Sequence, residues 1–172
     1  MTALVIFESM FGNNRKLAEA IAQGIAPQRP ATVVEVGSAP TSIDPAVTLL
    51  VVGGPTHGFG MTRPSTRRDA AKQATGPLVS TGIGVREWLE AASVPAGIAA
   101  AAWDTRVERP AFLKLIDRSA EGMAKGLKRL GCRLVLPPQH FAVQGVQGPL
   151  GPNELERARR WGEQLAQVAL GN

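Results

Sequence analysis

The chain contains no tyrosine, a single cysteine and few aromatic residues of any kind, 5% of 172 positions. Cys132 cannot form an internal disulfide, and its place beside the apolar run Leu134-Val135-Leu136 predicts a buried thiol. No apolar run approaches the roughly 20 residues that span a bilayer, and the chain begins with a strand-like segment instead of a signal peptide. We therefore expect a cytoplasmic protein that binds no membrane.

Acidic residues are fewer than basic ones, 14 against 19, which leaves a net charge of +5 and an isoelectric point near 10.1. The basic residues are mixed with acidic ones and do not alternate with aromatic residues, a pattern that argues against a nucleic-acid partner. The length and the hydrophobic content of 44% are typical of one domain, spanning 1–172, with a full core.

Apolar, strand-like runs alternate with helix-periodic segments, which is typical of βαβ units and a parallel sheet. The expected strands are Ala3–Phe7, Thr32–Val36, Leu49–Gly53, Ile98–Trp103 and Arg133–Val143, the last interrupted at Pro137 and Pro138. The expected helices are Arg15–Ile25, Val85–Ala92, Arg118–Leu130 and Glu154–Leu170, the last with a capping-box-like start at Asn153 and Glu156. Pro40 and Pro45 leave room for little more than a turn where a second helix would stand, so we expect that helix to be short or absent.

The segment Ser9-Met10-Phe11-Gly12-Asn13-Asn14 joins the first expected strand to the first expected helix. A helix N-terminus has N–H groups without helical partners and a partial positive charge, which together suit an anion. Gly12 permits a positive φ, and Ser9, Asn13 and Asn14 add polar side chains. Two interpretations stay open at this point: a phosphate site, or a βα turn in which Asn13 or Asn14 caps the helix.

Two further loops carry unusual residues at the carboxyl ends of expected strands, where open α/β sheets bind their ligands. The loop after the third strand contains Pro55, Thr56, His57, Gly58, Phe59 and Gly60, and the fourth strand ends in Trp103, Asp104, Thr105 and Arg106. We expect both loops to lie beside Ser9–Asn14. His140 stands in the last strand away from these loops in sequence, and we expect a structural role for it.

The first loop resembles the flavodoxin phosphate loop, Ser/Thr-x-Thr-Gly-Asn-Thr, which holds the phosphate of FMN. Phe11 stands where most flavodoxins have Thr, and the flavodoxin modules of flavodiiron proteins resemble this chain in accepting an aromatic residue there. Asn14 replaces the last Thr of the motif. The loop that begins at Pro55 is similar to the second flavin loop of flavodoxins and to the Pro-Thr-x-x-Gly loop of WrbA-type quinone reductases. The resemblance implies an α/β, flavodoxin-like three-layer sandwich with a five-stranded parallel sheet in the order 2-1-3-4-5.

The resemblance also implies roles for single residues around FMN. Flavodoxins commonly stack a Tyr on the flavin, and Trp103 is the substitute that this chain offers, with Phe59 or Phe112 as lesser choices; the alternative is that Trp103 packs the end of the sheet. His57 would contact the flavin or donate a proton near N5, or else hydrogen-bond its own loop. Arg106 near flavin N1 would stabilise the reduced, anionic flavin.

Three functions stay open on this resemblance. The first is an electron carrier, monomeric or weakly oligomeric, whose partner is a reductase or an acidic electron acceptor. The second is an NAD(P)H-dependent FMN oxidoreductase of the WrbA-like type, and the third is a flavodoxin-fold binding module that has lost FMN. Ordinary flavodoxins are acidic, whereas this chain places Arg63, Arg67, Arg68 and Lys72 just after the second flavin loop. These four residues form either a basic rim around the cofactor or a solvated helix face.

Overall fold

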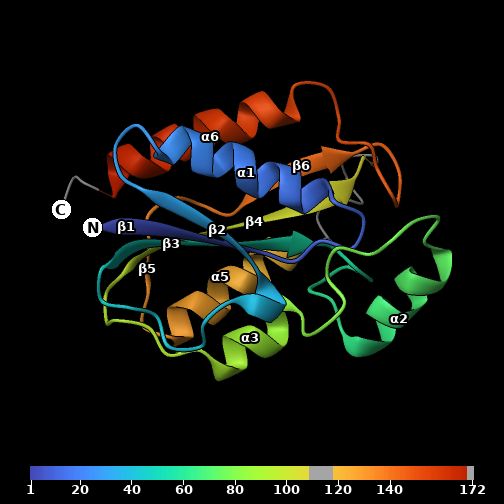
Figure 1. The fold of residues 1–172 in the computed structure, drawn as a ribbon, viewed down its shortest axis with the longest axis horizontal. Coiled ribbons are helices and arrows are strands. Elements are labelled where there is room, and N and C mark those ends of the chain that lie inside the picture. The colour runs from blue at the N-terminus through green and yellow to red at the C-terminus, as the bar shows by residue number, and fades with distance from the viewer. Residues whose placement is uncertain (109–117, 170–172) are drawn as a thin grey trace.

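The computed structural model describes residues 1–108 and 118–169 of the chain. In this part of the molecule a single sheet lies between two layers of helices (Figure 1). The helices α1 and α6 cover one face of the sheet, and α3 and α5 cover the other. The predicted three-layer α/β sandwich is therefore confirmed, and Phe112 lies outside the described residues.

The bounds of the elements agree closely with the sequence pattern. The strands are β1 (Thr2–Phe7), β2 (Ala31–Glu35), β3 (Val47–Pro55), β4 (Ala99–Val107), β5 (Arg133–Leu134) and β6 (Gln139–Val143). The helices are α1 (Asn13–Ile25), the short 3₁₀ helix η1 (Val36–Ser38), α2 (Pro64–Gln73), α3 (Val85–Ala91), α5 (Ser119–Arg129) and α6 (Glu154–Val168).

The strands are parallel and lie in the order β2-β1-β3-β4-β5, as the resemblance implies. Both β5 and β6 pair with β4: β5 meets its beginning at Ala99 and Ala100, and β6 meets its end from Trp103 to Val107. The predicted last strand is thus interrupted at the two prolines, because proline has no N–H to donate to the neighbouring strand. Its second half extends the edge of the sheet toward the loops.

The core is divided by the sheet into two hydrophobic clusters. Val5 and Val51 pack with α1 and α6, whereas Ile6 and Val52 face α3 and α5. Successive side chains of a strand point to opposite faces, so strands covered on both sides consist of continuous apolar runs. The same alternation decides which residues at the strand ends reach the site.

The helices α1 and α6 pack backbone against backbone at two glycines. A Cβ atom at Gly24 would lie 2.0 Å from the carbonyl oxygen of Arg159, and one at Gly162 would lie 2.2 Å from the carbonyl oxygen of Ile21. Both distances are far shorter than a van der Waals contact, so these positions accept no side chain. The close approach fixes α1 along the sheet and thereby positions the loop that precedes it.

Three local features complete the comparison with the sequence pattern. Between β2 and β3 the chain forms only η1, in agreement with the expected short second helix. The helix α2 was not among the expected elements, and it stands apart from the two helical layers (Figure 1). The expected capping box at Asn153 was wrong: this residue has a φ of 62° and its side chain makes no capping hydrogen bond.

Cys132 lies in the core beside α5, as expected, and burial raises the pKa of its thiol to about 11. A thiol with such a pKa is protonated at neutral pH and therefore a poor nucleophile. Among the described helices, none combines the length and the apolar character that crossing a membrane requires.

Candidate functional site

A pocket of about 340 Å³ opens at the carboxyl edge of the sheet, within the range of roughly 300–1,000 Å³ that small-molecule sites occupy. All three loops singled out in the sequence reach it. Its lining consists of Ser9, Met10, Phe11, Asn13 and Asn14, then Pro55, Thr56, His57 and Gly58, then Thr66, Asp69, Ala70 and Gln73, and finally Thr105, Val107, Val143 and Val146.

The first loop leads into α1 through a left-handed residue. Gly12 has a φ of 90°, a conformation that residues with a Cβ atom rarely adopt, and no side chain caps the helix there. The Ser9 hydroxyl accepts a hydrogen bond from Gly12 N–H at 3.0 Å, which closes the turn. The N-terminus of α1, with its free N–H groups and partial positive charge, therefore lies beside the pocket.

Asn14 does not cap α1, in contrast to one of the two expectations. Its side chain is buried, accepts a hydrogen bond from Trp103 Nε1 at 3.0 Å and donates one to Thr105 Oγ1 at 2.9 Å. Asn13 does not cap the helix either, because its amide donates to the carbonyl of Gln147 at 3.1 Å. Asn14 thus connects the first loop to the end of β4, a role that the sequence pattern did not reveal.

Trp103 packs into the sheet and offers no surface for stacking. Its side chain is fully buried, and its ring lies against Gly53 of the neighbouring strand, where an added Cβ atom would stand 2.0 Å from the ring. The expected flavin-stacking role of Trp103 was therefore wrong, and the alternative of a residue that packs the end of the sheet is the one observed.

The second loop turns tightly back on itself at the pocket. His57 and Gly60 exchange backbone hydrogen bonds of 2.9 and 3.2 Å, and the two residues between them, Gly58 and Phe59, both have positive φ, as in a type I′ turn. Phe59 is 50% exposed at the tip of this turn, outside the pocket lining. Burial, reinforced by the positive charge of Arg67, lowers the pKa of His57 below its ordinary value, so this pocket residue is neutral at pH 7.

Thr56 lines the pocket and has a buried hydroxyl without a partner among the described residues. Its Oγ1 atom is buried and makes no hydrogen bond with any described residue. A buried hydroxyl that lacks a partner costs about 1–3 kcal/mol, and protein structures leave few such groups unless a ligand or water satisfies them. A polar ligand group or a water molecule that reached this hydroxyl would therefore be stabilised at the pocket wall.

At the end of β4, Asp104 and Arg106 point away from the pocket, because they lie on the opposite face of the strand from Thr105. Asp104 is fully buried, and its Oδ2 accepts the N–H of Ala120 at 2.9 Å. Its Oδ1 lies 2.9 Å from His140 Nδ1, and Arg106 contacts both residues. Asp104 and Arg106 were expected to border the cofactor, but neither is among the residues that line the pocket.

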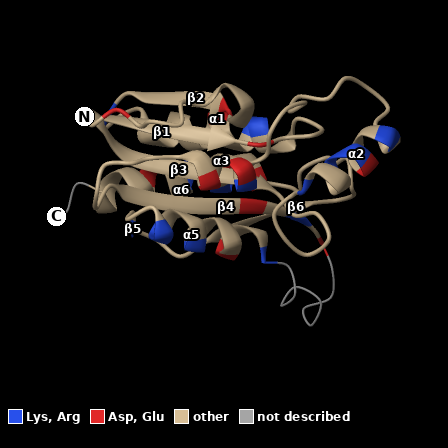
Figure 2. Cartoon of the chain, turned by 90° about the horizontal axis from the view of Figure 1, so that it is seen from below, with Lys and Arg blue, Asp and Glu red and all other residues tan. Residues whose placement is uncertain are grey.

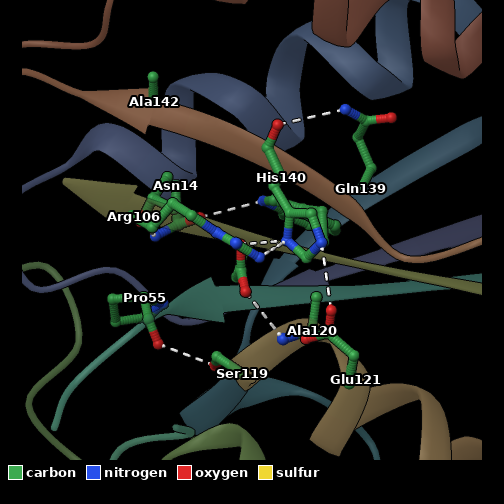
Figure 3. Close-up of polar contacts among 12 residues, drawn as sticks. Asn14, Pro55, Arg106, Ser119, Ala120, Glu121, Gln139, His140 and Ala142 are labelled. Atoms are coloured by element: carbon green, nitrogen blue, oxygen red, sulfur yellow. Dashed lines mark hydrogen bonds and ion pairs between the residues drawn. The ribbon is translucent and has the colours of Figure 1, made fainter. Parts of the chain in front are cut away.

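His140 has partners that its sequence position concealed. Its Nε2 lies 3.2 Å from Glu121 Oε1 at the start of α5, so the imidazole bridges a residue of β4 and one of α5 (Figure 3). Nearby, Ser119 points toward Pro55 and donates to its carbonyl at 3.1 Å (Figure 3). The atoms of Asp104, Glu121 and His140 are spaced closely enough to share a metal ion, but the Arg106 guanidinium already supplies the positive charge there.

The helix α2 forms the outer wall of the pocket through Thr66, Asp69, Ala70 and Gln73. Their spacing of three, four and seven residues places them on one helical face, but three of the four are polar, so no hydrophobic periodicity singles this face out in the sequence. Acidic and basic residues are mixed on α2 (Figure 2). Lys72 pairs with Asp69 at 3.4 Å, while Arg63 and Arg68 are exposed. None of Arg63, Arg67, Arg68 and Lys72 is among the residues that line the pocket.

Arg67 turns inward from α2 and pairs with Glu87 of α3. The two guanidinium nitrogens lie 3.0 and 3.2 Å from the carboxylate oxygens, and only 11% of the arginine side chain is exposed. Arg67 also donates to Thr62 Oγ1 at 2.9 Å, and this hydroxyl donates to Glu8 Oε1 at 2.5 Å. Glu8, which directly precedes the first loop, accepts a further hydrogen bond of 2.8 Å from Val85 N–H. This buried network holds α2 against the sheet.

Glu8 makes the stability of the fold dependent on pH. Burial raises the pKa of this carboxyl above its ordinary value of 4.5, although Thr62, Val85 and Arg67 oppose the shift. The stabilisation by Glu8 is therefore complete below pH 4.5 and is lost as the pH rises through the pKa of the folded state. In urea unfolding at several pH values, we expect the stability of the wild type relative to Glu8→Gln to fall as the pH rises above 4.5. A constant or rising difference would contradict this prediction.

No protein-family model and no curated protein sequence matches this chain. Solved structures do match it. A flavodoxin from the domain Archaea superposes with a TM-score of 0.68 at 18% identity, covering 99% of both chains. Flavodoxin 1 from Bacillus cereus gives a TM-score of 0.68 at 17% identity, over 97% of this chain and 98% of that one. A WrbA-like flavodoxin from Agrobacterium tumefaciens gives 0.60 at 18% identity, over 99% and 98%. The chain therefore has the flavodoxin-like fold that its loops predicted.

Proposed function

We propose that this chain binds FMN in the pocket at the carboxyl edge of the sheet and takes part in electron transfer. The observation that carries the proposal is the pocket itself, where the first loop at the N-terminus of α1 meets Thr56, a lining residue whose buried hydroxyl has no partner among the described residues. When bound, FMN supplies the redox chemistry, and the protein supplies binding and electrostatics.

The backbone of the loops leaves space for such a ligand. A Cβ atom placed on Gly12, Gly58 or Gly60 would meet no other atom within 4 Å, so the two turns that hold these glycines border open space and not packed protein. The phosphate would lie at the N-terminus of α1 near Ser9 and Asn13, where backbone N–H groups replace the two hydroxyls that the loop lacks relative to flavodoxins. Thr56 and the neutral His57 would offer hydrogen bonds to the polar parts of the flavin.

The positive net charge of the chain favours a redox partner of opposite charge. Because the net charge is +5 and Arg63, just before α2, and Arg68, on α2, are both exposed, the proposed redox partner is an acidic protein, whose association would weaken with added salt. A second candidate function is reduction of a substrate with NAD(P)H, favoured by the loop Pro55–Gly60 and by the fold shared with the WrbA-like flavodoxin.

The first experiment is an absorbance spectrum of the protein after incubation with FMN and desalting, followed by anaerobic reduction with NADPH and then dithionite. Retained flavin that only dithionite reduces supports an electron carrier that needs a reductase. Rapid bleaching by NADPH supports the enzymatic alternative. A colourless protein whose thermal stability is unchanged by FMN contradicts FMN binding and favours a binding module of the same fold.

The variant Thr56→Val tests the central contact. We expect FMN to bind about fivefold more weakly, because one hydrogen bond of about 1 kcal/mol is lost. The ligand-free protein should become more stable by about 1 kcal/mol, since the unpaired hydroxyl is removed from a buried position. Fluorescence titration with FMN and urea unfolding measure the two effects.

The matched control is Thr105→Val in the same pocket. The Thr105 hydroxyl accepts a hydrogen bond from Asn14, so its removal should destabilise the ligand-free protein by roughly 1–2 kcal/mol. If both variants shift the stability in the same direction, the Thr56 hydroxyl is not the unsatisfied group that the proposal requires.

A further inference from the structure

Gln147 does not line the pocket itself, but it connects its own turn to two other segments that border the pocket, the first loop and the end of α2. Gln147 donates a hydrogen bond from Nε2 to the carbonyl of Gln73, at 2.6 Å, and its Oε1 accepts one from Thr75 Oγ1 at 3.1 Å. Its own carbonyl accepts the Asn13 side-chain amide at 3.1 Å. These partners lie 72 to 134 positions away in the sequence.

The segment that carries Gln147 is anchored at its base. Val143 and Leu150 form an antiparallel bridge, and Gln144 N–H donates to the carbonyl of Pro149 at 2.9 Å. Gly151 N–H donates to Ala142 at 2.8 Å, next to the start of α6. The tip of this turn therefore holds a defined position over the first loop.

The contacts of Gln147 lie at the end of the pocket formed by the first loop, where the phosphate is proposed to bind. Asn13 belongs to the first loop, Gln73 ends α2, and both line the pocket, as does the neighbouring Val146. The Gln73 carbonyl belongs to the last turn of α2, where backbone oxygens have no helical partner, so the Gln147 amide caps that helix. Gln147 thereby joins the wall α2 to the loop at the N-terminus of α1.

We propose that Gln147 is a positioning residue that closes the pocket around the phosphate group of the bound ligand and slows its release. This inference rests on the proposed binding of FMN. The Gln147 side chain holds the end of α2 against this turn, and the Gln147 backbone carbonyl holds the Asn13 side chain at the mouth of the phosphate loop. Without these contacts, the phosphate end of the pocket opens more often, whereas the end that receives the ring is unchanged.

The experiment compares the release of FMN with that of riboflavin, which lacks the phosphate, by stopped-flow fluorescence. We expect Gln147→Ala to release FMN about tenfold faster and Thr75→Val about threefold faster, because they remove two and one of these hydrogen bonds. Riboflavin release should stay within a factor of two in both variants. Gln144→Ala is the matched control, as the same residue type in the same turn, and it should leave both rates unchanged.

Two results would overturn the inference: unchanged FMN release in Gln147→Ala, or riboflavin release that accelerates as much as FMN release. If the wild type binds neither flavin, the proposed function fails. Backbone hydrogen exchange in the ligand-free protein then tests separately whether Gln147 holds this end of the pocket closed. Faster exchange over 73–75 in Gln147→Ala than in Gln144→Ala would then support a closing contact at this end of the pocket. Equal exchange in the two variants would refute it.

Discussion

Gly53→Ala should destabilise the fold by about 3 kcal/mol, at the upper end of what overpacking a core usually costs. The added methyl group would stand 2.0 Å from the indole ring of Trp103, which is fully buried and has no room to retreat. Displacing this ring also breaks its hydrogen bond to Asn14, and with it the connection between β4 and the first loop. Urea unfolding followed by tryptophan fluorescence measures the loss.

The neighbouring residue provides the control. A Cβ atom on Gly54 would meet the Cβ of Glu8 at 3.3 Å, a contact that a small shift relieves, so Gly54→Ala should cost only about 1 kcal/mol. We also expect Gly53→Ala to bind FMN far more weakly than Gly54→Ala does. Equal losses of stability in the two variants would show that Trp103 is not packed as described.

Asn14→Thr should destabilise the protein by about 2–3 kcal/mol, although it restores the residue that flavodoxins have at this place in their phosphate loop. The shorter threonine cannot reach both Trp103 Nε1 and Thr105 Oγ1, so the buried indole N–H of Trp103 loses its hydrogen bond to Asn14 Oδ1. We expect no gain in FMN affinity, because the added hydroxyl does not compensate for a displaced loop. Thermal unfolding with and without FMN measures both effects.

The adjacent asparagine separates this effect from a general sensitivity of the loop. Asn13 is partly exposed and donates one hydrogen bond at the surface, so Asn13→Thr should lower the free energy of unfolding by less than about 1 kcal/mol. A larger loss in Asn13→Thr than in Asn14→Thr would contradict the role assigned to the buried amide. Together, the two variants distinguish the residue that holds the loop in place from the one that faces its mouth.

Much of the architecture followed from the sequence because its signals are local. Strands covered on both faces are continuous apolar runs, such as Leu49–Gly53, and helices follow at regular intervals. The two prolines at 137 and 138 marked the break in the last strand, because proline has no N–H group to donate to a neighbouring strand. The loop Ser9–Asn14 predicted the fold through its resemblance to a known phosphate loop, and the topology agrees.

The site was predicted as a set of loops more accurately than as a set of residues. Alternation along β4 sends Trp103 and Thr105 to one face and Asp104 and Arg106 to the other, but a sequence does not say which face borders the pocket. The partners of Arg67, Glu8 and Gln147 come from distant segments, and no local pattern indicates such pairs.

The sequence by itself determined the βα alternation, the strand order that its first loop implies, and the three loops at one edge of the sheet. These properties depend on local hydrophobic periodicity and on turn residues such as Gly12. Only the tertiary structure decided that Trp103 is buried, that α2 walls the pocket and that Asn14 and Gln147 hold it together. The physical reason is that a side chain's role depends on which groups lie within hydrogen-bonding or van der Waals distance, and folding brings those groups together from distant positions.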